Sequence, residues 1–327
     1  MDDVKPCVLV TGGAGYIGSH AVLALRDGGY RVVVVDDLST GCRELVPDDV
    51  PFIVGDIADQ PLISDLLRTH ACVGVMHFAG SIVVPESVSD PLKYYANNTA
   101  ASRDLIECCV HEGIRAFIFS STAVVYGVPS EVPISETADT RPISPYGTSK
   151  LMTEWILRDV AATTDLRYAA LRYFNVAGAD LQGRSGQAGP NTTHLIRVAC
   201  ELISGKRNSM EIFGTDYDTP DGTCIRDYVH VSDLVDAHLL ALEHLLSQRE
   251  NLILNCGYGL GYSVRQVLDV ARELSEIPLN ISTTDRRDGD APQLISDSSK
   301  IRDTLNWYPR LNDLRAIIES ALEWEQR

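Results

Sequence analysis

The first half of the chain alternates short apolar runs, rich in β-branched residues, with longer segments in which apolar residues recur at helical spacing. The short runs predict strands at residues 8–12, 31–37, 52–57, 74–80, 116–122 and 168–174, and the longer segments predict helices at 16–26, 92–112 and 146–162. Strands that alternate with helices form parallel sheets that helices cover. The sequence therefore predicts an α/β fold with a Rossmann-type doubly wound parallel sheet, which binds ligands at the carboxyl ends of its strands.

This alternation ends near residue 177, where two passages rich in turn-forming residues follow, at 178–193 and 214–228. Further on, the pattern predicts a helix at 231–248 and a strand at 252–257 that returns to the sheet. We therefore expect a Rossmann domain over residues 1–176, rejoined by residues 231–257. A smaller C-terminal α/β domain over residues 177–327 is expected to grip the substrate.

Composition narrows the class of protein. The chain has 327 residues, of which 45% are hydrophobic and 22% charged, the balance of a globular protein with a full core. A formal net charge of −17 disfavours nucleic acid and anionic membranes as partners. No signal segment or membrane-length apolar run is present, so we expect a cytoplasmic protein. The eight cysteines have no metal-ligand spacing, which predicts buried thiols and no metal site.

A glycine-rich turn, TGGAGYIGSH, joins the first predicted strand to the first helix. Glycines at positions such as Gly12, Gly15 and Gly18 let the backbone approach a pyrophosphate at the amino end of the helix. Asp36 ends the second strand, where a carboxylate can accept a hydrogen bond from a ribose 2′-hydroxyl. Asp37 follows it instead of a basic residue, so a 2′-phosphate would meet two negative charges. This pattern predicts a dinucleotide site that prefers NAD to NADP.

The end of the third predicted strand supplies two more candidates. Asp56 and Ile57 are placed there to contact the adenine of the dinucleotide. A helix cap and a core isoleucine remain the alternative interpretation of this pair.

The stretch SPYGTSK places a tyrosine four residues before a lysine, so that Tyr146 and Lys150 share one helix face. An adjacent ammonium and a cationic nicotinamide both favour the phenolate, and lowering the tyrosine pKa by about 3 units requires roughly 4 kcal/mol. Tyr146 would then be the proton acceptor and Lys150 the group that tunes it. The strand at 116–122 ends in Thr122, whose hydroxyl would share the reacting oxygen of the substrate.

Eight motifs occur in one order along the chain: TGGAGYIGSH, HFAGSIVVPESV, YYANNT, SSTAVVYG, SPYGTSK, LRYFNVAGA, DGTCIRDYVHV and RRDGDAP. From about residue 6 to 324, the chain resembles the extended short-chain dehydrogenase/reductases, and among them the UDP-glucose 4-epimerase family. The resemblance implies that Tyr146 takes the proton of the sugar 4-hydroxyl while hydride passes to bound NAD. The 4-keto sugar then turns over in the pocket and receives the hydride on its other face.

The resemblance also implies two sets of site residues. Around NAD it places the glycine turn with Tyr16, Ile17, Asp36, Asp37, Asp56, Ile57, Phe78, Ala79, Gly80, Asn97, Tyr146, Lys150 and Phe174. Around the UDP-sugar it places Thr122, Tyr146, Asn175, His194, Phe213, Arg226, Arg287, Asp290 and Leu294. Independently of the resemblance, Arg226 and Arg287 lie in loop-like stretches of an acidic chain and suit a diphosphate, with surface ion pairs as the alternative. Asp290 would hold a ribose hydroxyl or orient Arg287.

Four positions differ from the pattern of well-known family members. Thr122 stands where serine is common and keeps the hydroxyl. Ile82 stands where many members carry a lysine near the cofactor, so one cofactor contact is missing or comes from elsewhere. Leu294 replaces a tyrosine beside the sugar, which leaves entry of N-acetyl sugars open. His194 replaces an asparagine that contacts the substrate.

The resemblance also implies a homodimer that packs the helices at 92–112 and 146–162 against their copies, unless these faces only cover the sheet. Three alternatives to the hexose epimerase make different demands on the sequence. A nucleotide-sugar 4,6-dehydratase needs an acid and base directly after Thr122, where this chain has Ala123 and Val124. A UDP-pentose 4-epimerase stays open. A cofactor-sensing protein without catalysis usually lacks the tyrosine or lysine, and both are present.

Overall fold

A seven-stranded parallel sheet forms the base of the fold. The structure is a computed structural model that describes residues 6–189, 193–248, 250–287 and 290–327. The strand order is β10-β6-β5-β4-β1-β2-β3, with every neighbouring pair parallel. The strands are β1 (Cys7–Thr11), β2 (Arg31–Asp36), β3 (Phe52–Val54), β4 (Cys72–His77), β5 (Ala116–Thr122), β6 (Arg167–Tyr173) and β10 (Leu252–Cys256). The chain reverses its winding between β1 and β4, which is where such sheets bind ligands.

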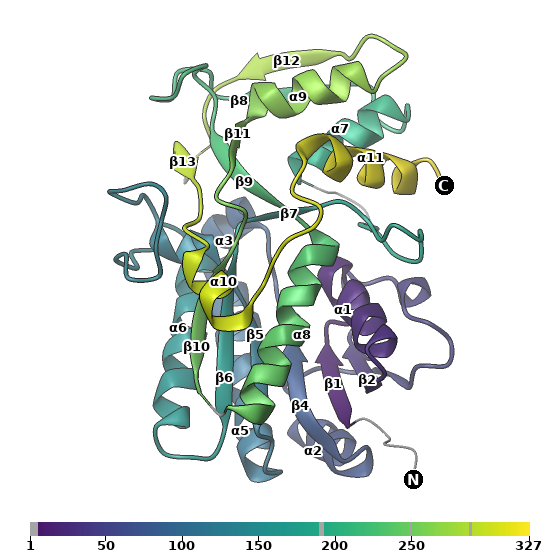
Figure 1. Ribbon diagram of the computed structural model, residues 1–327, viewed down its shortest axis with the longest axis vertical. Helices are drawn as coiled ribbons and strands as arrows, with labels where there is room; N and C mark the ends of the chain where they lie inside the picture. Colours follow the sequence, from purple (N-terminus) through teal and green to yellow (C-terminus); the bar gives the residue numbers. More distant parts are fainter. Residues whose placement is uncertain (1–5, 190–192, 249, 288–289) are drawn as a thin grey trace.

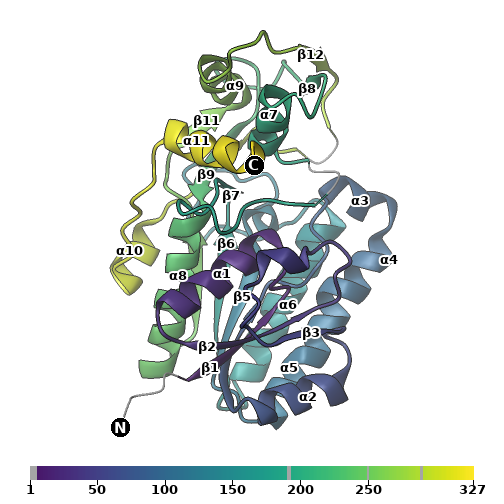
Figure 2. The same ribbon diagram turned by 90° about the vertical axis from the view of Figure 1, so that its right-hand side faces the viewer.

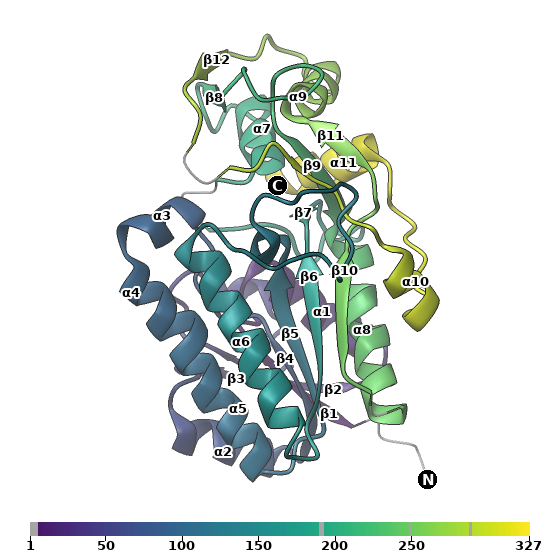
Figure 3. The ribbon, with the colours of Figure 1, turned by 90° about the vertical axis from the view of Figure 1, so that its left-hand side faces the viewer.

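Helices cover both faces of this sheet, and each face has its own apolar core. On one face α1 (Tyr16–Asp27) and α8 (Val231–Ser247) contribute Leu25 and Leu242 to the larger core cluster. On the other, α2 (Gln60–Thr69), α5 (Ala101–His111) and α6 (Pro145–Ala161) contribute Leu105 and Leu157 to the second cluster. Helix α1 faces the viewer in Figure 2, and α6 does so in Figure 3. The predicted doubly wound α/β fold is confirmed.

The sequence-based boundaries differ most from the structure at three places. Strand β3 ends at Val54 and β4 at His77, each three residues before the predicted end at 57 and 80. The helix expected at 92–112 is divided into α4 (Pro91–Tyr94), a π-helical turn (Tyr95–Ala100) and α5, and α3 (Val84–Ser89) precedes them. The wide turn is stabilised by Asn98, which accepts a hydrogen bond from the backbone N–H of Ser81 and donates one to its carbonyl. A π-turn of this kind commonly marks a functional site.

Smaller elements lie above the carboxyl ends of the large sheet (Figure 1). Strands β7 (Asn175–Ala177), β9 (Ile225–His230), β11 (Gly261–Ser263) and β13 (Gln293–Leu294) form one sheet, and β8 (Met210–Phe213) pairs with β12 (Ile281–Thr284). Helices α7 (Leu195–Ile203), α9 (Val264–Glu273) and α11 (Leu314–Glu325) pack around them, and α10 (Ser299–Leu305) lies beside β10. Two short 3-10 turns complete the list, Arg43–Leu45 and Ala123–Tyr126. Among the described residues, no helix is long and apolar enough to cross a membrane.

Candidate functional site

The glycine turn after β1 brings three stretches of backbone into close approach. Gly12 adopts a left-handed φ of +67°, and a Cβ atom there would lie 2.5 Å from the backbone nitrogen of Ala79. A Cβ atom on Gly18 would lie 2.1 Å from the carbonyl oxygen of Gly12. Both positions therefore require glycine, since the neighbouring atoms are backbone and cannot move aside. The turn leads into the amino end of α1 at Tyr16, and this cradle fits a pyrophosphate.

We expect Gly12→Ala to abolish NAD retention and to lower the melting temperature more than Gly113→Ala does. Both glycines have a left-handed φ, +67° and +70°, so alanine costs about 1–2 kcal/mol at either. A Cβ on Gly113 meets nothing within 4 Å, whereas at Gly12 it collides with the backbone at Ala79. Thermal unfolding and the NAD content of the purified variants measure the difference. Wild-type NAD content in Gly12→Ala would show that the close approach does not shape the cofactor site.

Asp36 holds the glycine turn to the end of β2. Its buried carboxylate accepts hydrogen bonds from the backbone N–H groups of Ala14 and Leu38, both at 2.9 Å. Burial raises the pKa of Asp36, and these two hydrogen bonds oppose the rise. The neighbouring Asp37 accepts from the backbone N–H of Ser39. Two carboxylates thus lie at this edge of the sheet, as NAD selection over NADP requires.

Asp56 and Ile57 lie beyond the end of β3. Asp56 is exposed and accepts a hydrogen bond from the backbone N–H of Ala58, while Ile57 is buried in the second core cluster. The residue that caps α2 is Asp59, so the alternative of a helix cap at Asp56 is wrong. An adenine contact by this pair stays a prediction.

The stretch after β4 lies between the glycine turn and the tyrosine-lysine helix. A Cβ atom on Gly80 would lie 3.6 Å from Nζ of Lys150 and 2.9 Å from Oδ1 of Asn98. The ring of Phe78 packs against His238, with centroids 5.0 Å apart. The amide of Asn97 donates to the hydroxyl of Ser81 at 2.9 Å. The π-turn therefore places Asn97 and Asn98 near Lys150, where the sequence predicts the nicotinamide end of the NAD site.

Tyr146, Lys150 and Thr122 meet at the carboxyl end of β5. Helix α6 begins at Pro145, and the hydroxyl of its N-cap Ser144 accepts a hydrogen bond from the backbone of the first turn. This start fixes Tyr146 in the first turn, where Tyr146 and Thr122 line the same cavity. One turn later, the buried Lys150 donates to the carbonyl of Ser120 at 3.0 Å.

Burial dominates the titration of this pair. It raises the pKa of Tyr146, which the nearby Thr122 hydroxyl partly opposes, and it lowers the pKa of Lys150 to about 8. Among the chain's own groups the tyrosine pKa rises because the phenol loses water on burial and the ammonium is directed at the Ser120 carbonyl. The lowered tyrosine pKa expected from the sequence requires the cationic nicotinamide together with the lysine, and it stays a prediction.

A buried ion pair behind the site was not anticipated from the sequence. Glu154, one turn beyond Lys150, pairs with Arg172 of β6 at 2.6 Å and accepts from the hydroxyl of Ser121 at 2.5 Å. Arg172 also donates to the hydroxyl of Tyr126, which donates to Asn255 of β10. The network joins α6 to three strands of the sheet. The sequence offered two signals of this pair: Glu154 lies one helical turn after Lys150, and Arg172 is a charged residue within an apolar run.

A cavity of about 300 Å³ opens beside the tyrosine and lies between the large sheet and the smaller elements. Many predicted residues line it, namely Tyr16, Ile17, Thr122, Tyr146, Phe174, Asn175, His194, Arg287, Asp290 and Leu294. Lining residues that were not assigned a role from the sequence include Tyr173, Gln187, Arg197 and Trp324. Tyr173 lies in one of the quoted motifs, whereas Gln187, Arg197 and Trp324 lie outside all of them.

Phe213 and Arg226 reach the cavity indirectly. The guanidinium of Arg287 lies 3.5 Å from the centroid of the Phe213 ring. Arg226 pairs with the carboxylate of Asp290 at 3.4 Å. Among the described residues, Asp290 thus orients Arg226 rather than Arg287, which corrects one of the two expected roles. The two arginines flank one side of the cavity, where they suit an anion.

The three remaining positions of interest form walls of the cavity. Leu294 is buried against Phe174 and lies beside Arg226 in the pairing of β13 with β9. Ile82 lines the cavity with 54% of its surface exposed. His194 is the N-cap residue of α7 and is hydrogen-bonded through Nδ1 to the amide of Gln187 at 2.8 Å. Burial and the charge of Arg197 lower the pKa of His194.

No cluster of metal-ligating side chains occurs among the described residues.

The doubly wound sheet, the glycine turn, the acid at the end of β2 and the tyrosine-lysine pair define a dinucleotide-binding enzyme of the short-chain dehydrogenase/reductase type. More narrowly, residues 8–257 match the model of the NAD dependent epimerase/dehydratase family, and the chain belongs to that family. The predicted family and the NAD cofactor are thereby confirmed.

Individual relatives match nearly the whole chain. The UDP-glucose 4-epimerase of Azospirillum brasilense is 57% identical over 98% of this chain and 92% of its own length. The crystal structure of the Brucella ovis UDP-glucose 4-epimerase with NAD superposes with a TM-score of 0.95 at 43% identity, covering 98% and 99% of the two chains. The Stenotrophomonas maltophila enzyme, solved with NAD and formylated UDP-arabinopyranose, gives 0.94 at 37% identity over 98% of each chain.

Proposed function

We propose that this enzyme is an NAD-dependent isomerase that interconverts the C4 epimers of a UDP-hexose, UDP-glucose and UDP-galactose. The observation that carries the proposal is that Tyr146 and Thr122 line the same cavity as Arg287 and Asp290. A reacting hydroxyl and a bound diphosphate can thus be held at once. The relatives of known activity support the same reaction.

In this reaction Tyr146 accepts the proton of the sugar 4-hydroxyl and later returns it. The hydroxyl of Thr122, which lines the same cavity, shares the reacting oxygen. Lys150, buried one turn from Tyr146, keeps a positive charge beside the site that favours the phenolate. Bound NAD supplies the hydride acceptor and donor.

The anionic end of the substrate is bound by two arginines. We propose that Arg226 and Arg287 hold the diphosphate, with Arg226 oriented by Asp290. Arg287 keeps its guanidinium over the Phe213 ring, an arrangement that leaves the guanidinium edge for phosphate oxygens. Asn175 and His194 complete the lining toward the sugar.

The structure disfavours dehydration for a local reason. After Thr122 come Ala123 and Val124, which form a short 3-10 turn. Val124 lines the cavity with an apolar side chain, so neither position offers an acid or a base. A UDP-pentose remains the second candidate substrate, because a 37% identical relative was solved with a formylated UDP-arabinopyranose.

The test is to incubate the purified protein, with no added cofactor, with UDP-galactose, with UDP-N-acetylgalactosamine and with UDP-xylose, and to separate the sugar nucleotides by chromatography. Formation of UDP-glucose from the first establishes the proposed reaction with resident NAD. Turnover of the second shows that Leu294 leaves room for an N-acetyl group. Turnover that starts when NAD is added would indicate that Ile82 weakens cofactor retention, and no conversion in any mixture contradicts the proposal.

We further propose a division into an NAD-binding domain, residues 1–176 with 231–257, and a UDP-sugar-binding domain in the rest of 177–327. We also propose a homodimer. Large apolar side chains are exposed on adjoining helices, Val88 on α3, Leu92 on α4 and Trp155 on α6, at 55%, 78% and 46%.

Such exposed apolar residues favour burial against a second copy. Trp155→Glu should convert the dimer to a monomer in sedimentation equilibrium, because it places a charge in the contact. A wild-type monomer would refute the dimer.

A further inference from the structure

Arg197 occupies an unfavourable place for a cation. It lies in the first turn of α7, where the helix dipole disfavours positive charge, within the otherwise mostly apolar stretch LIRVACELI. Its side chain lines the cavity and is 13% exposed. A charged group kept at such a position needs compensating contacts, and the structure supplies four of them.

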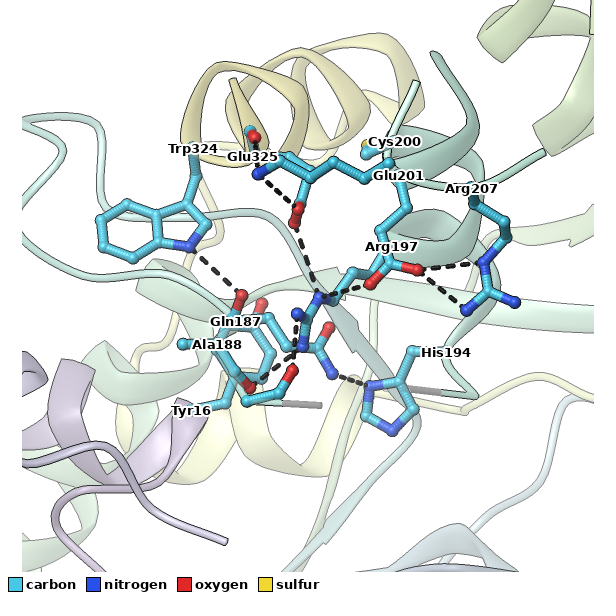
Figure 4. Close-up of polar contacts among 12 residues, drawn as sticks. Tyr16, Gln187, Ala188, His194, Arg197, Cys200, Glu201, Arg207, Trp324 and Glu325 are labelled. Atoms are coloured by element: carbon cyan, nitrogen blue, oxygen red, sulfur yellow. Dashed lines mark hydrogen bonds and ion pairs between the residues drawn. The ribbon is translucent and has the colours of Figure 1, made fainter. Parts of the chain in front are cut away.

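Two of these contacts are backbone carbonyls of the segment that leads to the cavity wall. The guanidinium donates to the carbonyl of Ala188 at 3.0 Å and to that of Gly189 at 2.8 Å. On its other side, Nε lies 3.3 Å from Glu201 and 3.5 Å from Glu325. Figure 4 shows Arg197 between Ala188 and the carboxylates of Glu201 and Glu325. Arg197 therefore ties the segment at 188–189 to α7 and α11.

The two carboxylates do not depend on Arg197 alone. Glu201 also pairs with Arg207 at 2.9 Å, and Glu325 pairs with Lys206 at 3.0 Å. Loss of the Arg197 guanidinium would thus leave each carboxylate with a cationic partner. The contacts to the carbonyls of Ala188 and Gly189 are the ones that this loss would remove.

The segment ahead of Ala188 is held at further points. The indole of Trp324 packs on Gly186, where a Cβ would lie 2.3 Å from the ring, and donates to the carbonyl of Gln187 at 3.2 Å. Gln187 in turn is hydrogen-bonded to His194 in the cavity wall. Arg197 and Trp324 thereby fix the main chain on both sides of the Gln187 carbonyl. The side chain of Gln187 then holds His194 through their hydrogen bond.

The same segment begins beside the cofactor cradle. The hydroxyl of Tyr16 donates to the carbonyl of Gly178 at 2.6 Å, and the hydroxyls of Ser19 and Ser185 lie 2.7 Å apart. Residues 178–189 therefore run from the amino end of α1 to the substrate wall. A segment fixed at both ends and along its length presents that wall in one conformation.

We propose that Arg197 is a positioning residue that sets the affinity for the UDP-sugar by fixing residues 187–189 and, through Gln187, the side chain of His194. The inference rests on the proposed function for the identity of the ligand. A wall that is ordered before binding does not have to be ordered during binding, which saves free energy. Loss of this order therefore weakens the binding of the ground state and of the transition state equally. The expected effect is therefore on KM and not on kcat.

The test compares Arg197→Met with the matched control Arg207→Met in the NAD-loaded protein. Both remove one guanidinium from the same network, but only Arg197 touches the carbonyls of Ala188 and Gly189. We expect Arg197→Met to raise KM for UDP-galactose and the calorimetric Kd for UDP-glucose by about tenfold or more, with kcat within about threefold and NAD content unchanged. Arg207→Met should match the wild type in all four quantities.

Wild-type KM and Kd in folded Arg197→Met, or equal changes in Arg207→Met, would overturn the proposal. A fall in kcat at unchanged KM would also overturn it, because the residue would then act on the reaction step. Arg197→Lys keeps the charge between the carboxylates but cannot reach both carbonyls with a fork, so it should fold and still raise Kd. If that variant binds as the wild type does, the carbonyl contacts carry no positioning role.

The binding measurement separates this inference from the proposed function. If the wild type binds UDP-glucose but turns over no sugar nucleotide, the proposed reaction fails, while the Kd of Arg197→Met against Arg207→Met still judges the positioning role. If the wild type does not bind UDP-glucose at all, both are overturned.

Discussion

Tyr146→Phe is expected to lower kcat for UDP-galactose by about 10³-fold, the effect of removing a proton acceptor from the reacting hydroxyl. Phenylalanine keeps the ring, which packs edge-on against Tyr94 with centroids 6.3 Å apart. The fold, the NAD content and KM should therefore stay close to those of the wild type. Steady-state kinetics and the absorbance of released NAD measure these quantities.

Tyr168→Phe is the matched control for this variant. It also removes one phenolic oxygen, but Tyr168 is buried in the second core cluster at the amino end of β6, away from the cavity. We expect its kcat to be unchanged. Equal losses in the two variants would point to damaged packing, and an active Tyr146→Phe enzyme would mean that another group accepts the proton.

Lys150→Met is expected to lower kcat by roughly 10²-fold or more without lowering the melting temperature. The activity falls because the ammonium favours the Tyr146 phenolate. Stability should hold because burial lowers the pKa of Lys150 from 10.5 to about 8, so keeping the ammonium at neutral pH costs the folded state roughly 3 kcal/mol. Differential scanning calorimetry and kinetics on the same samples separate the two effects.

The pH dependence follows from the same pKa shift. Between about pH 8 and 10.5 the unfolded chain holds a proton on this lysine that the folded chain has released, so stability from this group rises with pH in that window. Lys150→Met should lose this rise. Its activity should need a higher pH than the wild type, because the phenol pKa is higher without the cation.

Lys93→Met serves as the control for charge alone. Lys93 is exposed on α4 and pairs with Glu86, so its loss removes one positive charge outside the cavity. Wild-type kcat in this variant and a large loss in Lys150→Met locate the effect at the site. An active Lys150→Met enzyme with an unshifted pH profile would contradict the tuning role.

Features that depend on residues close together in the sequence were predictable. The glycine turn, the acid at the end of β2 and the tyrosine-lysine spacing each fall within one strand-helix unit, and the order of these units determines the parallel sheet. The strand positions followed from the apolar runs for the same reason. Even so, the local pattern did not show the π-turn at 95–100, because its stability comes from Asn98 binding the distant Ser81.

The amino-acid sequence by itself thus determined the fold class and the cofactor, and it predicted the proposed catalytic pair Tyr146 and Lys150. The tertiary structure alone decided which charges meet: Asp290 with Arg226, Glu154 with Arg172, and Arg197 with the carbonyls before the cavity wall. The physical reason is that backbone periodicity and turn chemistry act over a few residues. The partner of a buried charge depends instead on packing between segments that lie far apart in the sequence.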